Sequence, residues 1–472
     1  MLTIVGLGCS PEDLSRGAYN AVTSGAKVIL RTGETPAAQA ILSSGAPCAT
    51  LDYIYESCRN FDTLNKKLAS IVLKAAKESD VAYLVDGAVS EDNACKIILA
   101  RHKDTAVYEG VSKAARAVSL ARIKSTQYTG VSAYDIKNLK SCPAAAVYDI
   151  DCDYVAGEVK IKLTDLFGEE TLCSFIRGGK VKRIKVYEID RQKDYDMSCA
   201  VAIEEADFLH KERYDYADLL QLVRLLRAPG GCPWDRVQTN ATIKQNMIEE
   251  AYELVDAVNK NDDDMIEEET GDVLLQAAFH TVLKEEQSAF TSADVITRVV
   301  KKLIFRHSHI FGKDKAADEE AALSVWEKNK KEEKHQTTFT ESLLAVPINF
   351  PACMRAQKVG KRAAKCGMDF LSSISASEKL GEEVGELLQA LQNGDKDGIF
   401  EEAGDVLLSA VNTCRLAGVD CEEVLAAATD KFIDRFKAFE ELATKDGKEL
   451  TDMCDAEYDY YWFLAKNAVK KD

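Results

Sequence analysis

The arrangement of hydrophobic and polar residues divides the chain into two parts. Over roughly the first 205 residues, short apolar runs bounded by Gly, Asp and Ser alternate with helical segments, which is typical of α/β units. Two later apolar runs, Val159–Leu163 and Val181–Tyr187, are predicted as strands of a second, mixed sheet. The strands predicted before them are Leu2–Leu7, Lys27–Arg31, Val81–Val85, Ala106–Glu109 and Ala144–Ile150.

From about Tyr214 onward the apolar residues recur at helical period, and clusters of β-branched residues thin out. The segment Leu219–Leu226 ends at Pro229-Gly230-Gly231, a strong helix break. Pro347 and Pro351 mark a second boundary, after which the helical pattern restarts. Helices are predicted over residues 241–259, 263–286, 292–306, 318–334, 351–366, 374–392, 396–417, 421–443 and 454–468.

These patterns predict a multidomain protein. Its 472 residues are enough for two to four domains. We expect an α/β two-lobed domain over residues 1–210, followed by two all-α helical-bundle domains over residues 211–340 and 341–472.

An acidic pattern occurs twice in the helical part. The first copy reads Glu249-Glu250-x-x-Glu253 and then Glu269-x-x-Asp272; the second reads Glu382-Glu383-x-x-Glu386 and then Glu402-x-x-Asp405. In both copies 16 positions separate the last Glu of the first cluster from the Glu of the second. Because residues three or four apart share a helix face, two such faces brought together direct four carboxylates at one point.

Four carboxylates at one point repel one another and, without a cation, must share protons. Carboxylate oxygens are the ligands that Mg²⁺ prefers. A single Glu-Glu-x-x-Glu on an acidic helix is usually a solvated face. Here the duplication and the apolar Val-Leu-Leu that follows both Asp272 and Asp405 argue against that interpretation. The pattern therefore predicts a metal site in each copy.

Each copy continues with a Lys/Arg pair at i,i+4 spacing and then a Trp four residues before a Lys. The same order in two stretches of about 130 residues indicates duplication. Bound metal neutralises phosphate oxygens and activates water, and basic side chains hold the remaining charge, so the set suits a polyphosphate. The residues are Lys302, Arg306, Trp326 and Lys330 in the first copy and Lys431, Arg435, Trp462 and Lys466 in the second.

Over about residues 215–468 these motifs resemble the MazG family of all-α nucleoside triphosphate pyrophosphohydrolases. Gly231–Thr239 and Arg306–Gly312 are similar to stretches of the family's first repeat, and Ala356–Val359 and Gly367-Met368-Asp369 to its second. Asn240 and Ser308 depart from the His and Pro of the family, and we expect them to adjust fit only.

This resemblance implies hydrolysis of a nucleoside triphosphate to the monophosphate and pyrophosphate, in nucleotide-pool house-cleaning. It implies Mg²⁺, with Mn²⁺ as an alternative, in both copies. Catalytic assistance would come from Glu249, Glu382, Lys302, Arg306, Lys431 and Arg435. The metal ligands would be Glu250, Glu253, Glu269 and Asp272, and Glu383, Glu386, Glu402 and Asp405.

Residues 1–205 are similar to tetrapyrrole (corrin/porphyrin) methylases, on the Gly6-x-Gly8 turn, Tyr53–Glu56 and Gly157–Leu163. That resemblance implies S-adenosylmethionine between two lobes, at Gly6, Gly8 and Gly87. However, Ser10 stands where the family has a third Gly, and Asp86-Gly87-Ala88-Val89 replaces Pro-Gly-x-Pro. We interpret the domain as degenerate, with a structural or regulatory role; a retained ligand site is the alternative.

The composition argues against some classes of binding partner and favours one compartment. The net charge of −18 argues against nucleic acid and anionic membranes. Scattered cysteines without Cys-x-x-Cys spacing, no long apolar run and no basic N-terminal start favour a cytoplasmic protein. Thin helical domains favour a homodimer that completes four-helix cores. Two other functions stay open: an S-adenosylmethionine-dependent methyltransferase and a non-catalytic nucleotide-sensing scaffold.

Overall fold

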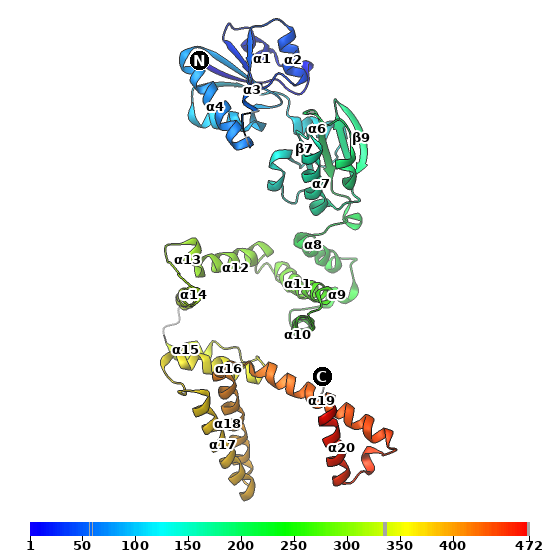
Figure 1. Ribbon diagram of the computed structural model, residues 1–472, viewed down its shortest axis with the longest axis vertical. Coiled ribbons are helices and arrows are strands. Elements are labelled where there is room, and N and C mark those ends of the chain that lie inside the picture. Colours follow the sequence, from blue (N-terminus) through cyan, green and yellow to red (C-terminus); the bar gives the residue numbers. More distant parts are fainter. Residues whose placement is uncertain (56, 59, 334–337, 470–472) are drawn as a thin grey trace. The chain divides into compact units, whose positions relative to one another are not determined.

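The computed structural model describes residues 1–55, 57–58, 60–333 and 338–469 (Figure 1). The chain forms two compact units, Met1–Ser292 and Ala293–Asp472. Glu56, the last residue of the Tyr53–Glu56 stretch, and residue 334, the expected end of a helix, lie outside the described ranges. Among the described residues, no helix is both long and apolar enough to cross a membrane.

The first unit begins with a lobe built on a five-stranded parallel sheet of order β3-β2-β4-β1-β5. Its strands are β1 (Leu2–Gly6), β2 (Lys27–Leu30), β3 (Cys48–Thr50), β4 (Val81–Val85) and β5 (Thr105–Tyr108). Strands β1 and β4 are buried at every position, because helices cover both faces of the sheet.

The helices of this lobe pack in two layers. On one face, α1 (Arg16–Val22) and α2 (Pro36–Ser43) form a core with β1, β2 and β4. On the other face, apolar residues of α3 (Asp52–Tyr55), α4 (Phe61–Glu78) and α5 (Asn93–Arg101) form a second core. The arrangement is a three-layer α/β sandwich, as alternating strands and helices predict.

The second lobe of this unit contains a mixed five-stranded sheet of order β6-β7-β10-β8-β9, in which only β6 and β7 are parallel. Helix α6 (Lys113–Ala121) packs on one face and α7 (Asp153–Phe167) on the other. The strands are β6 (Thr129–Ser132), β7 (Ala144–Tyr148), β8 (Leu172–Arg177), β9 (Lys180–Lys185) and β10 (Ala200–Glu204).

Six strand predictions are confirmed, as β1, β2, β4, β5, β7 and β9. The prediction of a strand at Val159–Leu163 is wrong, because this segment lies inside helix α7. Val155, Val159 and Leu163 recur every four residues on the buried face, whereas Ile161 is 57% exposed. Five residues of apolar and basic alternation are too few to distinguish a strand from one turn of an amphipathic helix.

The rest of the first unit is helical. It contains α8 (Tyr216–Arg227), α9 (Pro233–Val237), α10 (Asn246–Lys260) and α11 (Asp263–Glu286). Helix α10 starts five residues later than expected, because Thr239 and Thr242 form a hydrogen-bonded turn in the preceding loop. Leu220, Val223, Ala278 and Val282 form a core that joins α8 to α11.

Helix α12 (Ser292–Arg306) leads into the second unit, whose described residues are helices and connecting turns. The helical predictions are confirmed here to within two residues at most boundaries. The helices are α13 (Ser308–Phe311), α14 (Glu319–Glu333), α15 (Phe339–Leu344), α16 (Ala352–Ala363), α17 (Ser373–Asn393), α18 (Lys396–Leu416), α19 (Cys421–Lys445) and α20 (Asp455–Ala468).

Short 3₁₀ turns complete the chain. They are η1 (Pro11–Asp13), η2 (Val89–Glu91), η3 (Ala133–Asn138), η4 (Val186–Arg191), η5 (Phe208–His210), η6 (Ala364–Cys366) and η7 (Leu450–Asp452).

Candidate metal centres and the inter-lobe cleft

The acidic pattern occupies two helical hairpins of the same construction. In the first, Asn261 ends α10 in the left-handed conformation and the Asp262 side chain caps α11. In the second, Gly394 ends α17 in that conformation and Asp395 caps α18. A left-handed C-cap followed at once by an Asp N-cap reverses the chain tightly. The two acidic clusters of each copy are thereby brought to face each other.

In the first hairpin, one carboxylate oxygen from each of Glu250, Glu253 and Glu269 lies within 4.8 Å of the other two. Glu250 Oε1 also accepts a hydrogen bond of 3.2 Å from Gln276 Nε2, which orients it. Burial, and then the neighbouring Asp272 carboxylate, raise the pKa of Glu250. Three of the four carboxylates that the spacing predicted are in this group, and Asp272 is outside it.

Glu269 carries the clearest sign of a missing partner in this hairpin. Its Oε2 atom is buried and has no hydrogen-bond partner among the described residues. Burial, and then the charge of Glu253, raise the pKa of Glu269. A buried carboxylate oxygen without a donor costs free energy unless a cation or a proton meets it.

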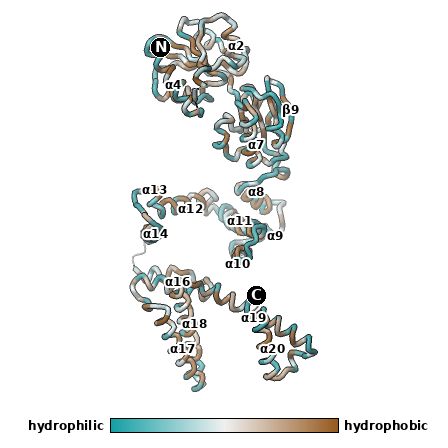
Figure 2. The backbone as a smooth tube through the Cα atoms, viewed as in Figure 1, coloured by the Kyte–Doolittle hydropathy of each residue, from teal (hydrophilic) through white to brown (hydrophobic). Residues whose placement is uncertain are grey.

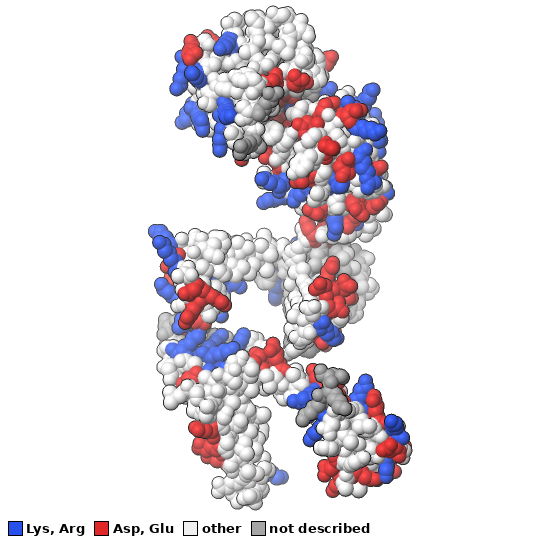
Figure 3. All heavy atoms as spheres, in the orientation of Figure 1, with Lys and Arg blue, Asp and Glu red and all other residues white. Residues whose placement is uncertain are grey.

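The second hairpin repeats the cluster with a different membership. Oxygens of Glu383, Glu402 and Asp405 lie within 4.8 Å of one another, and Glu383 is only 7% exposed. Burial, and then the charge of Glu386, raise the pKa of Glu402. Figure 3 shows acidic side chains gathered on this hairpin of α17 and α18.

Glu249 and Glu382 hold equivalent positions at the start of the two clusters. Glu249 is exposed on α10. Glu382 forms an ion pair of 3.0 Å with Lys379, which also pairs with Glu383 at 2.9 Å. These two ion pairs raise the pKa of Lys379. The residue of the first hairpin that corresponds to Lys379 is Asn246, so among the described residues only the second cluster has a lysine paired with its acids.

We predict that Lys379→Met tightens metal binding at the second cluster. Without nucleotide, the ammonium group competes with a divalent cation for Glu383, and a partly exposed ion pair of this kind is worth about two- to five-fold in affinity. Mn²⁺ binding followed by calorimetry on the Glu250→Gln background would report this cluster alone. Lys445→Met, an exposed lysine at the end of α19, is the control; equal affinities in the two variants would contradict the prediction.

The two Lys/Arg pairs have different settings within the second unit. The Arg306 Nε atom pairs with Glu333 at 2.7 Å, and its guanidinium lies 5.2 Å from the Trp326 ring centre; Lys302 is partly exposed. Arg435 and Lys431 lie on α19, and the buried Nε atom of Arg435 has no hydrogen-bond partner within the described ranges. Among the described residues, neither Lys431 nor Arg435 forms a hydrogen bond or ion pair with the second acid cluster.

The three glycines assigned to a cofactor lie at the carboxyl ends of β1 and β4. Gly8 and Gly87 form an isolated bridge, with backbone hydrogen bonds of 3.1 and 2.8 Å. Both have positive φ, of 76° in each case, which favours glycine. Gly6 lies against Gly110 of the loop after β5.

A family model described as the MazG nucleotide pyrophosphohydrolase domain matches residues 238–311 and 372–439, which contain both acidic sets. The nucleoside triphosphate pyrophosphohydrolase/pyrophosphatase MazG of Thermotoga maritima is 39% identical over 251 residues, covering 53% of this chain and 95% of that protein. The chain belongs to the MazG family. It is therefore a member of a hydrolase family, as the repeated acids and their surroundings indicated.

Two further comparisons with this MazG-family chain involve a full-length relative and a solved structure. The uncharacterized protein YabN of Bacillus subtilis is 30% identical and aligns over 100% of this chain and 99% of its own length. A uroporphyrin-III-C-methyltransferase structure from Thermus thermophilus aligns with 43% of this chain and 92% of its own, at 16% identity and a TM-score of 0.32. No conclusion about function follows from the latter likeness.

Two residues of the acid clusters were missed in the sequence. Lys379 lies three and four residues before Glu382 and Glu383, so the helical spacing alone could have placed it on their face. Gln276 follows Asp272 by four residues, so helical spacing also places it on the face of the acids. Gln276 is uncharged and Lys379 is positively charged, so a search for acidic residues passes over both.

Proposed function

We propose that the helical part hydrolyses nucleoside triphosphates between the α and β phosphates, releasing the monophosphate and pyrophosphate. The observation that carries the proposal is the pair of carboxylate clusters, each with oxygens within 4.8 Å, in two hairpins of the same construction. In the first cluster the buried Oε2 atom of Glu269 has no hydrogen-bond partner among the described residues, and in the second Lys379 pairs with Glu383. Both observations fit a site that binds a cation.

The donor set fits Mg²⁺, with Mn²⁺ as the alternative. Glu250, Glu253, Glu269 and Asp272 would hold it in the first copy, and Glu383, Glu386, Glu402 and Asp405 in the second. Bound there, the metal supplies charge neutralisation of the phosphates and a water of lowered pKa. In the same proposal, Glu249 and Glu382 would assist through water or the outer shell of the bound metal.

The basic residues differ between the copies in a way that bears on turnover. In the second copy, the Nε atom of Arg435 has no partner in the described structure, whereas Arg306 of the first copy is held by Glu333. An arginine already paired within its own fold has less capacity to hold a phosphate. We therefore propose that both copies bind metal and that Lys431 and Arg435 serve the copy that turns over.

The test is product analysis on a panel of nucleoside and deoxynucleoside triphosphates with Mg²⁺. Monophosphate and pyrophosphate in equal amounts are the expected products. Diphosphate with orthophosphate would assign cleavage to the other anhydride bond and contradict the proposal. The absence of any product with Mg²⁺ or Mn²⁺ would favour a nucleotide-sensing scaffold.

We also propose the domain limits 1–210, 211–340 and 341–472. Buried apolar clusters support them, because each lies within one of these ranges. Four clusters lie in the α/β range, one joins α8 and α11, and one joins α19 and α20.

The acidic hairpins have apolar faces that their own copy does not cover. Along α17 and α18, Leu388 is 54% exposed and Leu407 is 67% exposed. Figure 2 shows both hydrophobic and hydrophilic stretches along these two helices. The first hairpin exposes Ile248, Tyr252, Val255 and Val258 of α10. Two-helix hairpins of this kind are stable when a second pair completes a four-helix core. We propose that a second copy of the chain supplies that pair, giving a homodimer.

We predict a particle of twice the chain mass of 52.0 kDa in light scattering after gel filtration. Leu388→Glu with Leu407→Glu should release monomers, because the charges cannot be buried in a four-helix core. Leu344→Glu on α15, where the side chain is 79% exposed, is the control and should remain dimeric. A monomeric parent protein would contradict the proposal.

A further inference from the structure

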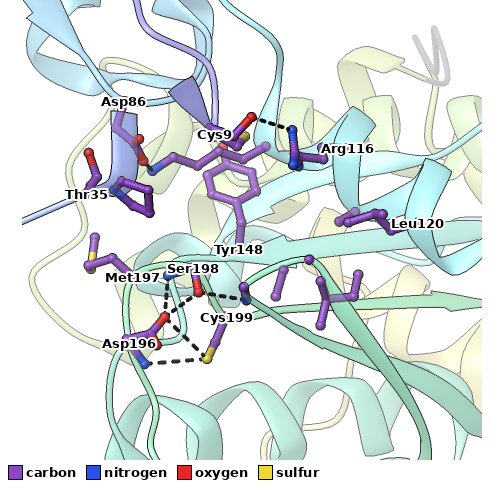
Figure 4. Close-up of a pocket in the computed structure, with 18 of the residues that line it drawn as sticks. Cys9, Thr35, Asp86, Arg116, Leu120, Tyr148, Asp196, Met197, Ser198 and Cys199 are labelled. Carbon is purple, nitrogen blue, oxygen red and sulfur yellow. Dashed lines mark hydrogen bonds and ion pairs between the residues drawn. The ribbon is translucent and has the colours of Figure 1, made fainter. Parts of the chain in front are cut away.

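A cavity of about 410 Å³ lies between the two α/β lobes of the first unit (Figure 4). Cys9, Thr35 and Asp86 line it from the first lobe, and Arg116 and Tyr148 from the second. Part of its wall is made by the loops that follow β1 and β4. Ligands of open parallel sheets bind at such carboxyl ends, and the methylase resemblance implies S-adenosylmethionine there.

The glycines of these loops do not face open space. A Cβ atom on Gly6 would lie 2.4 Å from the backbone nitrogen of Gly110, and one on Gly8 would lie 2.3 Å from Asp13 Cβ. A Cβ atom on Gly87 would lie 2.8 Å from Lys113 Cγ. Glycines that cradle a ligand leave room that the ligand fills. Here the chain's own atoms fill that room.

The backbone donors of the two loops are also occupied. Gly8 and Gly87 donate to each other, and Leu7 donates to the Val85 carbonyl at 2.8 Å. The Cys9 and Ser10 amides donate to Asp13 Oδ2 at 2.9 and 3.0 Å. In the second loop, the Ala88 amide donates to Glu91 and the Val89 amide to Glu109. A cofactor would find none of these N–H groups free.

Lys113, at the start of α6 in the second lobe, bridges the cleft. Its Nζ atom pairs with Asp86 of the first lobe at 2.8 Å and with Asp149 of the second at 2.7 Å. All three side chains are at most 15% exposed. Burial alone would lower the pKa of Lys113, but the carboxylates of Asp149 and Asp86 raise it overall. The lysine is therefore charged and held from both sides.

Further polar contacts also join the two lobes across the cleft. Arg116 of α6 pairs with Asp13 of the first lobe at 2.8 Å. Glu91 of the first lobe accepts hydrogen bonds from the Ser112 hydroxyl and from the amides of Lys113 and Ala114, so it caps α6. The cations next to the cavity are thus engaged in joining the lobes.

We propose that this cleft is a joint between the lobes and not a site for S-adenosylmethionine. Lys113 lies over Gly87, where the cofactor would approach the backbone, and its pairing with Asp86 and Asp149 holds the lobes together. Asp86, which stands in place of the proline of the methylase loop, is one half of this joint. Its ion pair with Lys113 gives a structural reason for an aspartate at a position where the methylase family has a proline.

Calorimetric titration of the full chain with S-adenosylmethionine, and separately with S-adenosylhomocysteine, tests the first half of the proposal. The expected result is no saturable heat with either ligand. Binding of one ligand per chain with a Kd of about 1–100 µM would overturn it. The readout does not depend on pyrophosphohydrolase activity, so failure here leaves the function proposed for the helical part untouched.

Thermal unfolding and hydrogen exchange of Lys113→Met test the second half. Two nearly buried carboxylates lose their cation, so the transition of the α/β unit should fall by about 10 °C and exchange should rise in residues 86–91 and 113–121. Lys103→Met, at an exposed lysine, is the control. If Lys113→Met does not fold, Asp86→Asn with Lys113→Met should restore part of the stability. A Lys113→Met variant with the control's transition and exchange would overturn the joint.

Discussion

Replacing Glu250 and Glu383 together by glutamine is expected to lower pyrophosphate release by roughly 10³-fold. Each substitution keeps the size of the side chain and removes one negative charge from a cluster whose oxygens lie within 4.8 Å of one another. Loss of a charged ligand weakens metal binding, and without metal the phosphates are neither neutralised nor approached by an activated water. Steady-state rates at a fixed Mg²⁺ concentration that half-saturates the parent protein measure the effect.

The single variants divide the loss between the copies. If the second copy turns over, Glu383→Gln should account for nearly the whole loss and Glu250→Gln for little. Glu267→Gln on α11 and Glu440→Gln on α19 are matched controls, because both carboxylates are exposed outside the clusters. Wild-type turnover in the double variant would show that these acids are not the site.

Mg²⁺ is expected to stabilise the metal-free protein near neutral pH and to lose that effect as the pH falls. At a concentration of about 100 times Kd, binding to the folded state alone is worth about 2.7 kcal/mol, or roughly 5–10 °C in the unfolding temperature. Burial and neighbouring carboxylates raise the pKa values of Glu250, Glu269 and Glu402. Protons therefore compete with the metal at a higher pH than for ordinary glutamates.

The sign of the pH effect in the metal-free protein follows from the same shifts. A carboxyl group with a raised pKa binds more protons in the folded state than in the unfolded state. Its favourable contribution is fully present below the unfolded pKa and is lost as the pH rises through the folded pKa. At neutral pH the clusters therefore oppose folding, and Mg²⁺ removes that repulsion.

Thermal unfolding with and without Mg²⁺, at about pH 7.5 and about pH 5, tests this expectation. The Glu250→Gln, Glu383→Gln variant serves as the control and should show a much smaller shift with Mg²⁺ at either pH. A Mg²⁺ shift that grows on acidification, or that persists unchanged in this variant, would contradict the assignment of these carboxylates to a metal.

Much of the helical part could be predicted from the sequence, because its signals are local. The 3.6-residue period and the caps at Asp262 and Asp395 set the helix limits, and the limits of α12 match the expected 292–306. The segment Val159–Leu163 shows where local signals fail. Its helix is fixed by residues on either side, Val155 and Phe167, which pack into the same core.

The sequence by itself determined the MazG resemblance, the duplication and the identity of the acids, since spacing along a helix dictates which carboxylates share a face. The tertiary structure decided how they meet. The first cluster draws on Glu253, whereas the second draws on Asp405 and is held by Lys379. It also decided that Lys113 joins Asp86 to Asp149 across the lobes. The contact across the lobes depends on the packing of elements far apart in the chain, which no local pattern encodes, whereas the Lys379 contact lies within one helix and follows its spacing.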